Sequence, residues 1–500
     1  MCLITFLVVE GTKPPESHEP VIIAGGGLAG LSAALEALEH GSSVIIIESE
    51  KNTGGNSAKA SSGINAHSTA AQEKLGIIDS ATKFFYDTKQ AGDGENDEKL
   101  VHVLVENSPN AIRFLGKVGV NLDDVNLCGG HSVARTHWVP SPAEGRPIPV
   151  GFEIMRKLRE AISKWNEKKP DSVRILTETR VKGLYTWNDL IIGVVAQLKN
   201  GTKVEINGKA VILATGGFSA DVEPNGLLEE FSPHLAAFPT TNGHFARGDG
   251  IKMARALDCP LVGMNHVQVH PTAFVDPADP AAKTKFLAAE ALRGKGAILI
   301  DASGRRFANE LGRRDHLSKM ILTKGSIFDE FQGGSGNRPS AVMLMSEEMV
   351  KQFGHPAFNF YYKVKKFFTR YENLQKLADA LRITRDILAS TLDTYNADAM
   401  KKYDEFGKTI FPNGFEDNKP IYAALVTPAV HYTMGGIKID KHARVETHYS
   451  GLFAAGEVSG GVHGSNRLAG NSLLECVVFG RIAGEMASRV GREKEFHTEL

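Results

Sequence analysis

The sequence predicts an α/β fold in which a Rossmann-like nucleotide-binding domain is interrupted by an inserted α+β domain that caps it. First, a short apolar strand pattern, Val21–Ala24, runs directly into a glycine-rich turn and then a strong helix pattern. Second, residues 268–430 are richer in aromatic and charged side chains than the chain around them. Third, the C-terminal part returns to strand patterns that end in glycine and an acid. We therefore place the first part of the nucleotide-binding domain at 18–267, the inserted domain at 268–430 and the second part at 431–490.

Composition is that of a globular protein and excludes several function classes. The 500 residues carry 57 Lys+Arg against 58 Asp+Glu, a net charge of −1, which argues against a nucleic-acid binder. No apolar stretch reaches the ~18–20 residues of a membrane span. The four cysteines are too far apart for a disulfide scaffold, a haem attachment motif or an iron–sulfur ligand set, and we expect no metal site.

The N-terminal region has the pattern of a βαβ unit. The strand pattern Val21–Ala24 is followed by Gly25–Gly30, a GxGxxG turn, and then by Leu31–His40, which is rich in strong helix formers. A second strand pattern, Ser43–Ile47, ends at Glu48. An acid at this spacing accepts hydrogen bonds from the ribose hydroxyls of a dinucleotide, so the unit predicts dinucleotide binding.

Each residue of the glycine turn has a physical role in this prediction. Gly25 allows the tight turn, and Gly27 lets a pyrophosphate approach the backbone. Gly30 lets the helix pack closely against the strand. The helix N-terminus, which begins with Leu28 and Ala29, faces the phosphates with its free N–H groups.

The dinucleotide is predicted to be FAD rather than NAD. Strand pattern Ala210–Ala214 ends in Thr215–Phe218, and Gly451–Glu457 places another acid just after a short strand. Flavoproteins draw contacts to a long FAD molecule from such separated segments. The chain has only one GxGxxG turn, so a second nucleotide domain for NAD(P)H is not evident.

The remaining elements follow from hydrophobic periodicity and composition. We expect amphipathic helices, followed by a β-rich segment and, in the inserted domain, an aromatic run and a further helix. In chain order these are Ser80–Lys89, Glu98–Leu115, Phe152–Lys164, Arg174–Val211, Phe358–Tyr371 and Leu374–Ala397.

Several longer motifs resemble those of one flavoprotein family. They are Gly54–Ser57 with Ser61–Asn65, Gly248–Gly250, His270–Thr272, Glu290–Gly294, Arg305–Asp315, His431–Gly436, Gly461–Leu468 and Asn471–Leu474. Over residues 20–490 the chain resembles the soluble fumarate reductases of fungal and protist type. These belong to the FAD-dependent oxidoreductase 2 family and are similar to the flavoprotein subunit of succinate dehydrogenase and fumarate reductase.

The resemblance implies which residues contact FAD. Beyond the βαβ unit they are Asn56, Ser57, Ser62, Gly63, Asp249, Glu457, Ser472 and Leu473. Membrane-bound relatives carry a histidine, covalently linked to FAD, where this chain has Asn56. The resemblance therefore implies non-covalent FAD.

The resemblance also implies the substrate and its ligands. Fumarate is a rigid dianion, and planar arginine forks match carboxylates in bidentate fashion. By position in the motifs, Arg467 and His431 hold one carboxylate and His270 holds the other. Clamping one carboxylate polarises the double bond for hydride delivery from flavin N5 to one alkene carbon.

Proton delivery is the second half of the implied reaction. The residue aligned with the family's proton donor is Arg314, and an arginine can act so only if it regains its proton at once. Glu290 and Arg293, at helical i,i+3 spacing, supply the relay to solvent. Which arginine is catalytic depends on the scheme, so Arg293 and Arg314 are both candidates. The plainer interpretation of Glu290 and Arg293 is a salt pair on the helix.

Other polar residues of these motifs receive no catalytic role. Arg305, Arg306 and Arg313 are interpreted as a solvated basic loop, with Arg306 able to pair with Glu310. The segment Gly129–His137 is expected only to shape the flavin site.

Alternative functions stay open at this stage. Haem-containing bacterial relatives bind a substrate carboxylate with a threonine where this chain has Ala289, so a urocanate reductase or an L-aspartate oxidase is the alternative within the superfamily. A ketosteroid dehydrogenase fits poorly, because the expected site is rich in arginine and histidine. A non-catalytic FAD-binding scaffold would lack at least one of His270, Arg314, His431 and Arg467, and all four are present.

With no built-in electron relay in the sequence, the expected electron donor is reduced FMN or FAD or another small donor, serving to reoxidise flavins when oxygen is scarce. We expect a monomer. Residues Cys2–Val9 form an apolar run without a preceding cation, and the last four residues, His497–Leu500, resemble an ER retrieval signal. Cytoplasm, ER lumen and mitochondrion all stay open.

Overall fold

Five short apolar segments form a parallel sheet at one end of the molecule in the computed structural model, which describes residues 7–11, 18–61, 63–140, 148–416 and 418–491. The order across the sheet is β20 (Leu452–Ala454), β11 (Ala210–Leu213), β2 (Val21–Ala24), β3 (Val44–Ile47) and β7 (Val173–Leu176). Every neighbouring pair is parallel. The residues of β2, β3 and β11 are all buried, which is typical of a parallel sheet covered on both faces.

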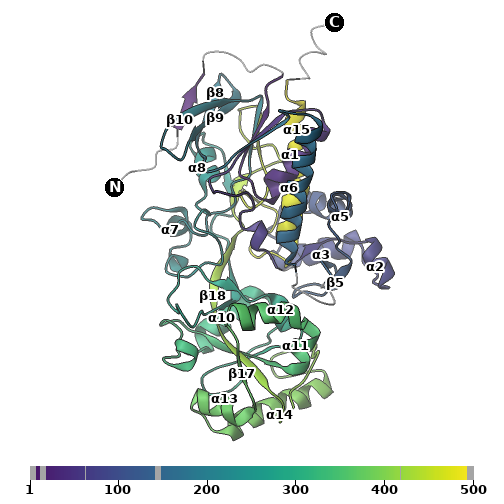
Figure 1. The fold of residues 1–500 in the computed structure, drawn as a ribbon, viewed down its shortest axis with the longest axis vertical. Coiled ribbons are helices and arrows are strands. Elements are labelled where there is room, and N and C mark those ends of the chain that lie inside the picture. The colour runs from purple at the N-terminus through teal and green to yellow at the C-terminus, as the bar shows by residue number, and fades with distance from the viewer. Residues whose placement is uncertain (1–6, 12–17, 62, 141–147, 417, 492–500) are drawn as a thin grey trace.

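Three long helices pack beside this sheet: α1 (Leu28–Glu39), α6 (Val150–Lys168) and α15 (Asn471–Arg489). Figure 1 shows α15, close to the C-terminus, lying along α1, close to the N-terminus. Two glycines on α15 allow this close approach. An added Cβ would lie 2.5 Å from the Ala29 carbonyl oxygen at Gly480 and 2.2 Å from the Ala33 carbonyl oxygen at Gly484.

Smaller elements surround this half of the molecule. One sheet has the order β1 (Leu7–Glu10), β8 (Arg180–Trp187), β9 (Leu190–Gln197), β10 (Lys203–Asn207). Two three-stranded sheets are β12 (Leu261–Val262), β19 (Gly436–Lys438), β21 (Ser459–Gly460) and β4 (Ile64–Asn65), β6 (Thr136–Trp138), β5 (Asp124–Asn126). The helices are α2 (Ala70–Lys74), α3 (Ala81–Ala91), α4 (Glu98–Glu106), α5 (Ser108–Lys117), α7 (Leu227–Phe231) and α8 (Asp249–Arg255).

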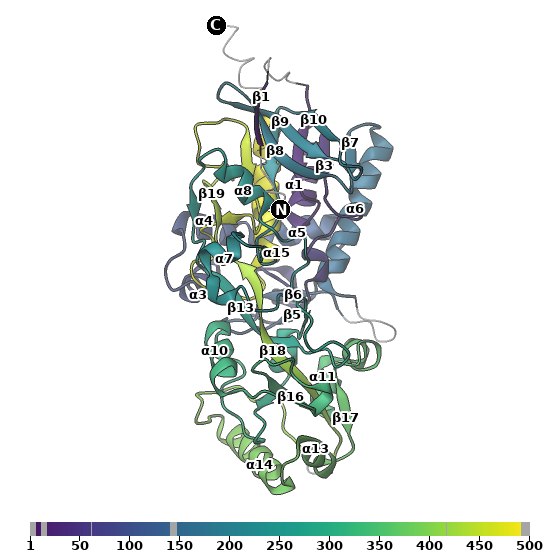
Figure 2. The same ribbon diagram turned by 90° about the vertical axis from the view of Figure 1, so that its left-hand side faces the viewer.

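The other half of the molecule is built on an antiparallel sheet whose strands differ in length. Its order is β14 (Phe286–Leu287), β13 (Val267–Phe274), β18 (Ile421–Thr433), β16 (Ala341–Ser346), β15 (Ile298–Ile300), with β17 (Thr369–Tyr371) also paired to β18. The helices are α9 (Glu290–Gly294), α10 (Arg314–Lys324), α11 (Glu347–Phe353), α12 (His355–Asn359), α13 (Leu374–Leu381) and α14 (Arg385–Lys401). Figure 2 shows β18 running from one half of the molecule into the other.

Two expected helices are each divided in the structure. The segment Glu98–Leu115 forms α4 and α5, which meet at Asn107. Pro109 lies in the first turn of α5, where its missing N–H costs nothing, whereas inside one long helix it would remove a hydrogen bond. The segment Leu374–Ala397 forms α13 and α14, because Arg382 ends α13 in the left-handed conformation with φ 58°.

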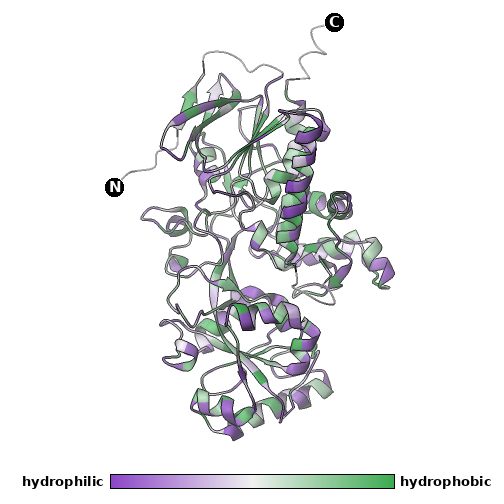
Figure 3. Ribbon diagram, viewed as in Figure 1, coloured by the Kyte–Doolittle hydropathy of each residue, from purple (hydrophilic) through white to green (hydrophobic). Residues whose placement is uncertain are grey.

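The buried apolar side chains form two separate clusters. One runs from Val21 to Met264 and resumes at Val430, and the other lies between Phe274 and Val426. Figure 3 shows hydrophobic green along the inner strands of both halves. The mixed helix-and-strand class is confirmed, while the boundaries at 267/268 and 430/431 stay a prediction. None of the helices in the described part of the chain is long and apolar enough to cross a membrane.

Candidate active site

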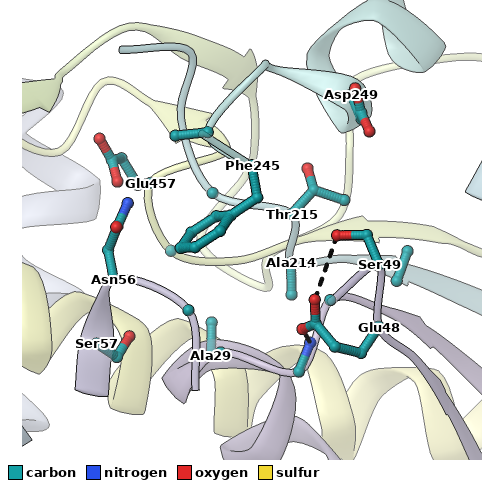
Figure 4. A pocket seen from close by; sticks show the side chains of 18 of the residues that line it. Ala29, Glu48, Ser49, Asn56, Ser57, Ala214, Thr215, Phe245, Asp249 and Glu457 are labelled. Carbon is teal, nitrogen blue, oxygen red and sulfur yellow. Dashed lines mark hydrogen bonds between the residues drawn. The ribbon is translucent and has the colours of Figure 1, made fainter. Parts of the chain in front are cut away.

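A pocket open to solvent, with about 840 Å³ of empty space, lies at the carboxyl ends of β2, β3 and β11. It is lined by the glycine turn Gly25–Ala29, by residues after the other strands and by Asn56, Ser57, Phe245, Asp249 and Glu457. Figure 4 shows Glu48 and Asp249 at one end of it, Asn56 and Glu457 at the other, and Phe245 between them. This edge of an open parallel sheet is where nucleotide ligands bind in α/β folds.

The glycine turn leaves room where a phosphate would approach the backbone. Gly27 is the N-cap of α1 without a side-chain cap, and an added Cβ there would meet only Ser57 Oγ, at 3.9 Å. Ser57 Oγ accepts a hydrogen bond from the Leu28 N–H at 3.3 Å. Gly30 faces the other way, since its Cβ would lie 2.0 Å from the Gly25 carbonyl oxygen. The turn therefore has the open face and the close helix packing expected of a dinucleotide site.

Glu48 is fixed at the end of β3 by the backbone. Its Oε2 accepts from the Gly26 N–H at 2.8 Å, and its Oε1 accepts from the Glu50 N–H at 2.9 Å. Oε1 also accepts from the Ser49 hydroxyl at 3.3 Å. The carboxylate lines the cavity, and Oε2 keeps a lone pair for a ribose hydroxyl.

Arg180 and Asp249 form an ion pair at the same end of the cavity. Arg180 donates to the two carboxylate oxygens of Asp249 through Nε and Nη2, each at 2.6 Å. Asp249 is the first residue of α8, where a negative charge suits the helix dipole. Arg180 was missed from the sequence, because nothing in the β8 pattern marks which of its polar side chains meets α8.

The other end of the cavity carries a carboxyl and an amide. Glu457 Oε1 accepts from the Thr433 N–H at 3.0 Å, and burial raises the pKa of Glu457 to about 7 against the effect of this bond. Asn56 Oδ1 accepts from the Gly243 N–H at 2.9 Å, which orients the amide. Of the other cofactor residues expected from the resemblance, Gly63, Ser472 and Leu473 are not part of the cavity lining, and Ser62 lies outside the described residues.

A second polar cluster lies where β13 and β18 pair, and two irregularities in this ladder create it. Gln268 pairs with Tyr432 but Val269 pairs with Val430, so His431 is an extra residue on β18. His270 pairs with Ala429 but Ala273 pairs with Thr427, so β13 carries an extra residue at Pro271–Thr272. Such bulges re-aim side chains beside active sites, and here the ring centroids of His270 and His431 lie 5.2 Å apart.

Both histidines have one ring nitrogen fixed. His270 Nδ1 lies 3.0 Å from the Thr272 carbonyl oxygen and 3.2 Å from the Thr272 backbone nitrogen. His270 Nε2 is buried and has no hydrogen-bond partner in the described part of the chain. His431 Nδ1 lies 2.7 Å from Thr241 Oγ1. Burial and then the Arg314 guanidinium hold the pKa of both rings well below 6.5, so both are neutral at neutral pH.

Arg314, the first residue of α10, is held by hydrogen bonds at all three guanidinium nitrogens. Nε and Nη2 donate to Glu290 Oε2 at 3.1 and 2.7 Å, and Nη1 donates to Gln268 Oε1 at 3.1 Å. Glu290 Oε1 accepts from the Gly129 N–H at 2.8 Å. Burial alone would raise the pKa of Glu290, but Arg314 and Arg293 outweigh it and lower that pKa to about 2.

Arg467 lies over an aromatic ring rather than beside a carboxylate. Its guanidinium carbon is 4.7 Å from the centroid of the Tyr432 ring, and its Nε is buried without a hydrogen-bond partner among the described residues. The Tyr432 hydroxyl donates to Glu475 Oε2, and His463 Nε2 lies 3.0 Å from the same oxygen. Burial, followed by Arg314, lowers the pKa of Arg467 to about 10, so the group is still protonated at neutral pH.

The FAD binding domain family matches residues 20–473, nearly the whole chain. The chain belongs to the FAD binding domain family. FAD is therefore its cofactor, and it is an FAD-dependent oxidoreductase.

Two fumarate reductases align with this protein over most of the length of both chains. It is 40% identical to Fumarate reductase 1 of Saccharomyces cerevisiae over 94% of this chain and 98% of the relative. It is 37% identical to a fumarate reductase of Schizosaccharomyces pombe over 94% of this chain and 90% of the relative. A solved structure of the open conformation of a flavocytochrome c3 fumarate reductase superposes with a TM-score of 0.74, at 32% identity, over 95% of this chain and 79% of that one.

Two expectations about charged residues of this FAD-family protein need correction. Glu290 is bonded to Arg314 rather than to its helical neighbour Arg293, which donates through Nη1 to the Glu310 carbonyl oxygen at 2.6 Å. Arg306 is not in a solvated loop: its side chain is 5% exposed and pairs with Glu310, as the spacing allowed, and with Asp404. A sequence pattern does not show that α14 and the segment after it cover this arginine.

Sequence reasoning also missed the residues that hold the cluster in place. Gln268 bonds both Arg314 and Asn466, and Thr241 orients His431. The segment Gly129–His137 was expected only to shape the flavin site, but the Gly129 N–H donates a hydrogen bond to Glu290 Oε1. Their partners are 46 to 198 residues away along the chain, so only the fold brings them together.

Proposed function

We propose that this chain is a fumarate reductase that reduces fumarate to succinate between an FAD-binding domain and a capping domain. The observation that carries the proposal is the cluster of buried cationic and neutral donors around His270 and Arg467. His270 Nε2 and Arg467 Nε have no hydrogen-bond partner in the described part of the chain. Buried polar groups are normally satisfied, so these atoms point to a ligand. A dicarboxylate supplies acceptors at both ends. The fumarate reductase names of the relatives support the same substrate.

The cavity at the parallel sheet fits FAD. Gly27 leaves the N-terminus of α1 open, Glu48 is aimed at the ribose position and Glu457 lies at the far end. We propose that the attachment is non-covalent, because Asn56 presents an amide, which is not a nucleophile, and its oxygen is already bonded to Gly243. When bound and reduced, FAD supplies the hydride.

In this proposal His270, His431 and Arg467 bind the two carboxylates. We assign to His270 the neutral tautomer that carries hydrogen on Nε2. Nδ1 then accepts the Thr272 N–H at 3.2 Å although it also faces the Thr272 carbonyl oxygen at 3.0 Å, and Nε2 donates to the substrate. Thr241 fixes the same tautomer of His431 by donating to Nδ1. Arg467 then forms the charged hydrogen bonds to one carboxylate, because a buried guanidinium without a carboxylate partner is costly.

Arg314 donates the proton. Its contacts with Glu290 and Gln268 fix the plane of the guanidinium. The Glu290 carboxylate, which returns the lost proton to Arg314, lies against Nε and Nη2. Glu290 is ionised at neutral pH and carries the proton only in transit. Arg293, buried beside Glu290, is the proposed next member of the relay.

Electrons are proposed to come from reduced FMN or FAD, or another small donor, and the working unit is proposed to be a monomer. The test is anaerobic: the FAD-loaded protein is reduced with FMNH2, fumarate is added, and flavin reoxidation and succinate are measured. Reoxidation with stoichiometric succinate is the expected result. If urocanate or iminoaspartate reoxidises the flavin and fumarate does not, fumarate is not the substrate, while the assignment of FAD as cofactor is unaffected.

A further inference from the structure

Asp93 joins three segments that no sequence motif connects. It lies just after α3, in the turn that follows Ala91, and adopts a left-handed backbone with φ 55°. Arg313 donates to both of its carboxylate oxygens, Nη1 to Oδ1 at 2.6 Å and Nη2 to Oδ2 at 2.8 Å. The Ser465 hydroxyl donates to Oδ2 at 2.5 Å. We call Asp93, Arg313 and Ser465 the Asp93 clasp.

The two partners of Asp93 are sequence neighbours of proposed substrate-handling residues. Arg313 is the N-cap of α10 and precedes Arg314 directly, while Ser465 lies two residues before Arg467. The Ser465 segment is tied to the same turn by further bonds. The Ser465 N–H donates to the Gly92 carbonyl oxygen at 3.2 Å and Asn466 Nδ2 donates to the Ala91 carbonyl oxygen at 3.1 Å.

The clasp also joins the two apolar cores. The α3 turn and the Ser465 loop lie in the half that holds the parallel sheet, and α10 packs its Leu317 and Ile321 into the other core. Arg313 Nε also donates to Oδ1 of Asp315, on the same helix, at 3.1 Å. This bond helps to hold the Arg313 guanidinium in the orientation that faces Asp93. The guanidinium of Arg313 and the Ser465 hydroxyl lower the pKa of Asp93 to about 2, so the clasp keeps its charge at neutral pH.

We infer that Asp93 is a positioning residue for the reductase: by binding Arg313 and Ser465 together it sets the distance between Arg314 and Arg467 across the substrate site. This rests on the proposed function for the roles of those two arginines. Asp93 does not touch the substrate ligands. It acts through the backbone on either side, where a shift of about 1 Å is enough to reduce a rate a hundredfold.

The kinetic test uses surface variants that remove no core side chain. Asp93→Asn and Arg313→Gln are each expected to lower kcat/KM for fumarate about tenfold, mainly through kcat, with FAD content and unfolding temperature unchanged. The double variant is expected to lose no more than either single one, because both remove the same contact. Arg305→Gln, an exposed arginine of the same region, is the control and keeps native kinetics.

A second measurement decides the inference without any turnover. Backbone hydrogen exchange of the FAD-loaded Asp93→Asn protein is expected to increase at least threefold both in residues 313–318 and in residues 463–468, compared with Arg305→Gln. Unchanged exchange in both segments, or additive kinetic losses in the double variant, would overturn the clasp. If the native protein reduces no fumarate while the exchange result holds, the proposed function fails and the clasp stands as a contact between the two halves.

Discussion

At the scale of single residues, the sequence predicts the roles that depend on nearby residues, but it does not predict contacts between residues that are distant along the chain. Gly25, Gly27, Gly30 and Glu48 were predicted with their physical roles because turn, helix and acid are within 24 residues of one another. Gln268 carries no such local signal. Its amide binds Arg314 on one side and Asn466 on the other, and both contacts depend on how β13 is placed.

The proposed proton donor, Arg314, gives the first prediction. Arg314→Ala is expected to lower kcat at least about a hundredfold, since general acid catalysis typically contributes that much, while FAD stays bound. Steady-state kinetics with fumarate and the flavin absorbance of the purified variant check this. Arg305→Gln serves as the control, and activity above a tenth of the native value would remove Arg314 from this role.

The neutral histidines predict a flat pH dependence of fumarate binding. Burial and Arg314 hold the pKa of His270 and His431 well below 6.5. Both imidazoles are therefore already deprotonated at pH 6.5, and no charge on them is lost as the pH rises further. KM for fumarate is expected to stay constant from pH 7.5 to 8.5, a range above the pKa of about 7 of Glu457, whose charge interacts with Arg467. A tenfold rise in KM per pH unit would instead mean that an imidazolium binds the substrate.

The Tyr432 ring predicts an effect on substrate affinity. Tyr432→Leu removes the face on which the Arg467 guanidinium lies, a contact worth roughly 1–2 kcal/mol when buried, so KM for fumarate is expected to rise about 5- to 30-fold. Tyr432→Phe keeps the ring and is the matched control, with KM within about twofold of native. Equal KM values for the two variants would contradict the stacking role.

At the scale of elements, periodicity predicted where helices lie better than where they end. Helix α6 was expected at Phe152–Lys164 and is found at Val150–Lys168, because its buried positions recur with helical spacing. The interruption between α13 and α14 depends on one residue, Arg382, in a conformation that side chains rarely adopt. Periodicity is insensitive to such a single backbone change, since the apolar spacing continues across it.

The contact between α1 and α15 gives a prediction about stability. Gly484→Ala places a Cβ 2.2 Å from the Ala33 carbonyl oxygen, so the helices must separate, and the free energy of unfolding is expected to fall by about 1–3 kcal/mol. Gly116→Ala on α5 is the control. Apart from its chain neighbours and the backbone of its own helix, no atom of the described residues lies within 4 Å of its added Cβ, and a gain of about 0.5–1 kcal/mol is expected. Urea unfolding of both FAD-loaded variants checks this, and equal effects would contradict the packing argument.

At the scale of the whole molecule, the sequence predicted an α/β protein with an inserted segment, and the structure contains two apolar cores. Composition shifts locate such a segment because its aromatic side chains, among them Phe358 and Phe367, form a core of their own. Composition says nothing of how the two cores face each other. That arrangement depends on tertiary contacts, such as the bond from Gly129 to Glu290.

A site shared by two cores predicts that substrate stabilises the whole protein. Fumarate at a hundred times its dissociation constant is expected to raise the free energy of unfolding of the FAD-loaded protein by about 2.7 kcal/mol. Thermal unfolding with and without fumarate measures it. Arg467→Ala should show no such shift at the same concentration, and an equal shift in that variant would mean that fumarate binds elsewhere.

The ladder between β13 and β18 has a consequence for how such proteins can be recombined. The chain passes from the first core to the second along β13 and returns along β18, and each crossing carries one of the two histidines at a bulge. In the proposed reaction the two crossings therefore carry substrate ligands. Exchanging the inserted segment between relatives cuts the chain beside His270 and His431, so a chimera keeps its activity only when both junctions preserve the bulges, and the two halves are constrained to evolve as a pair.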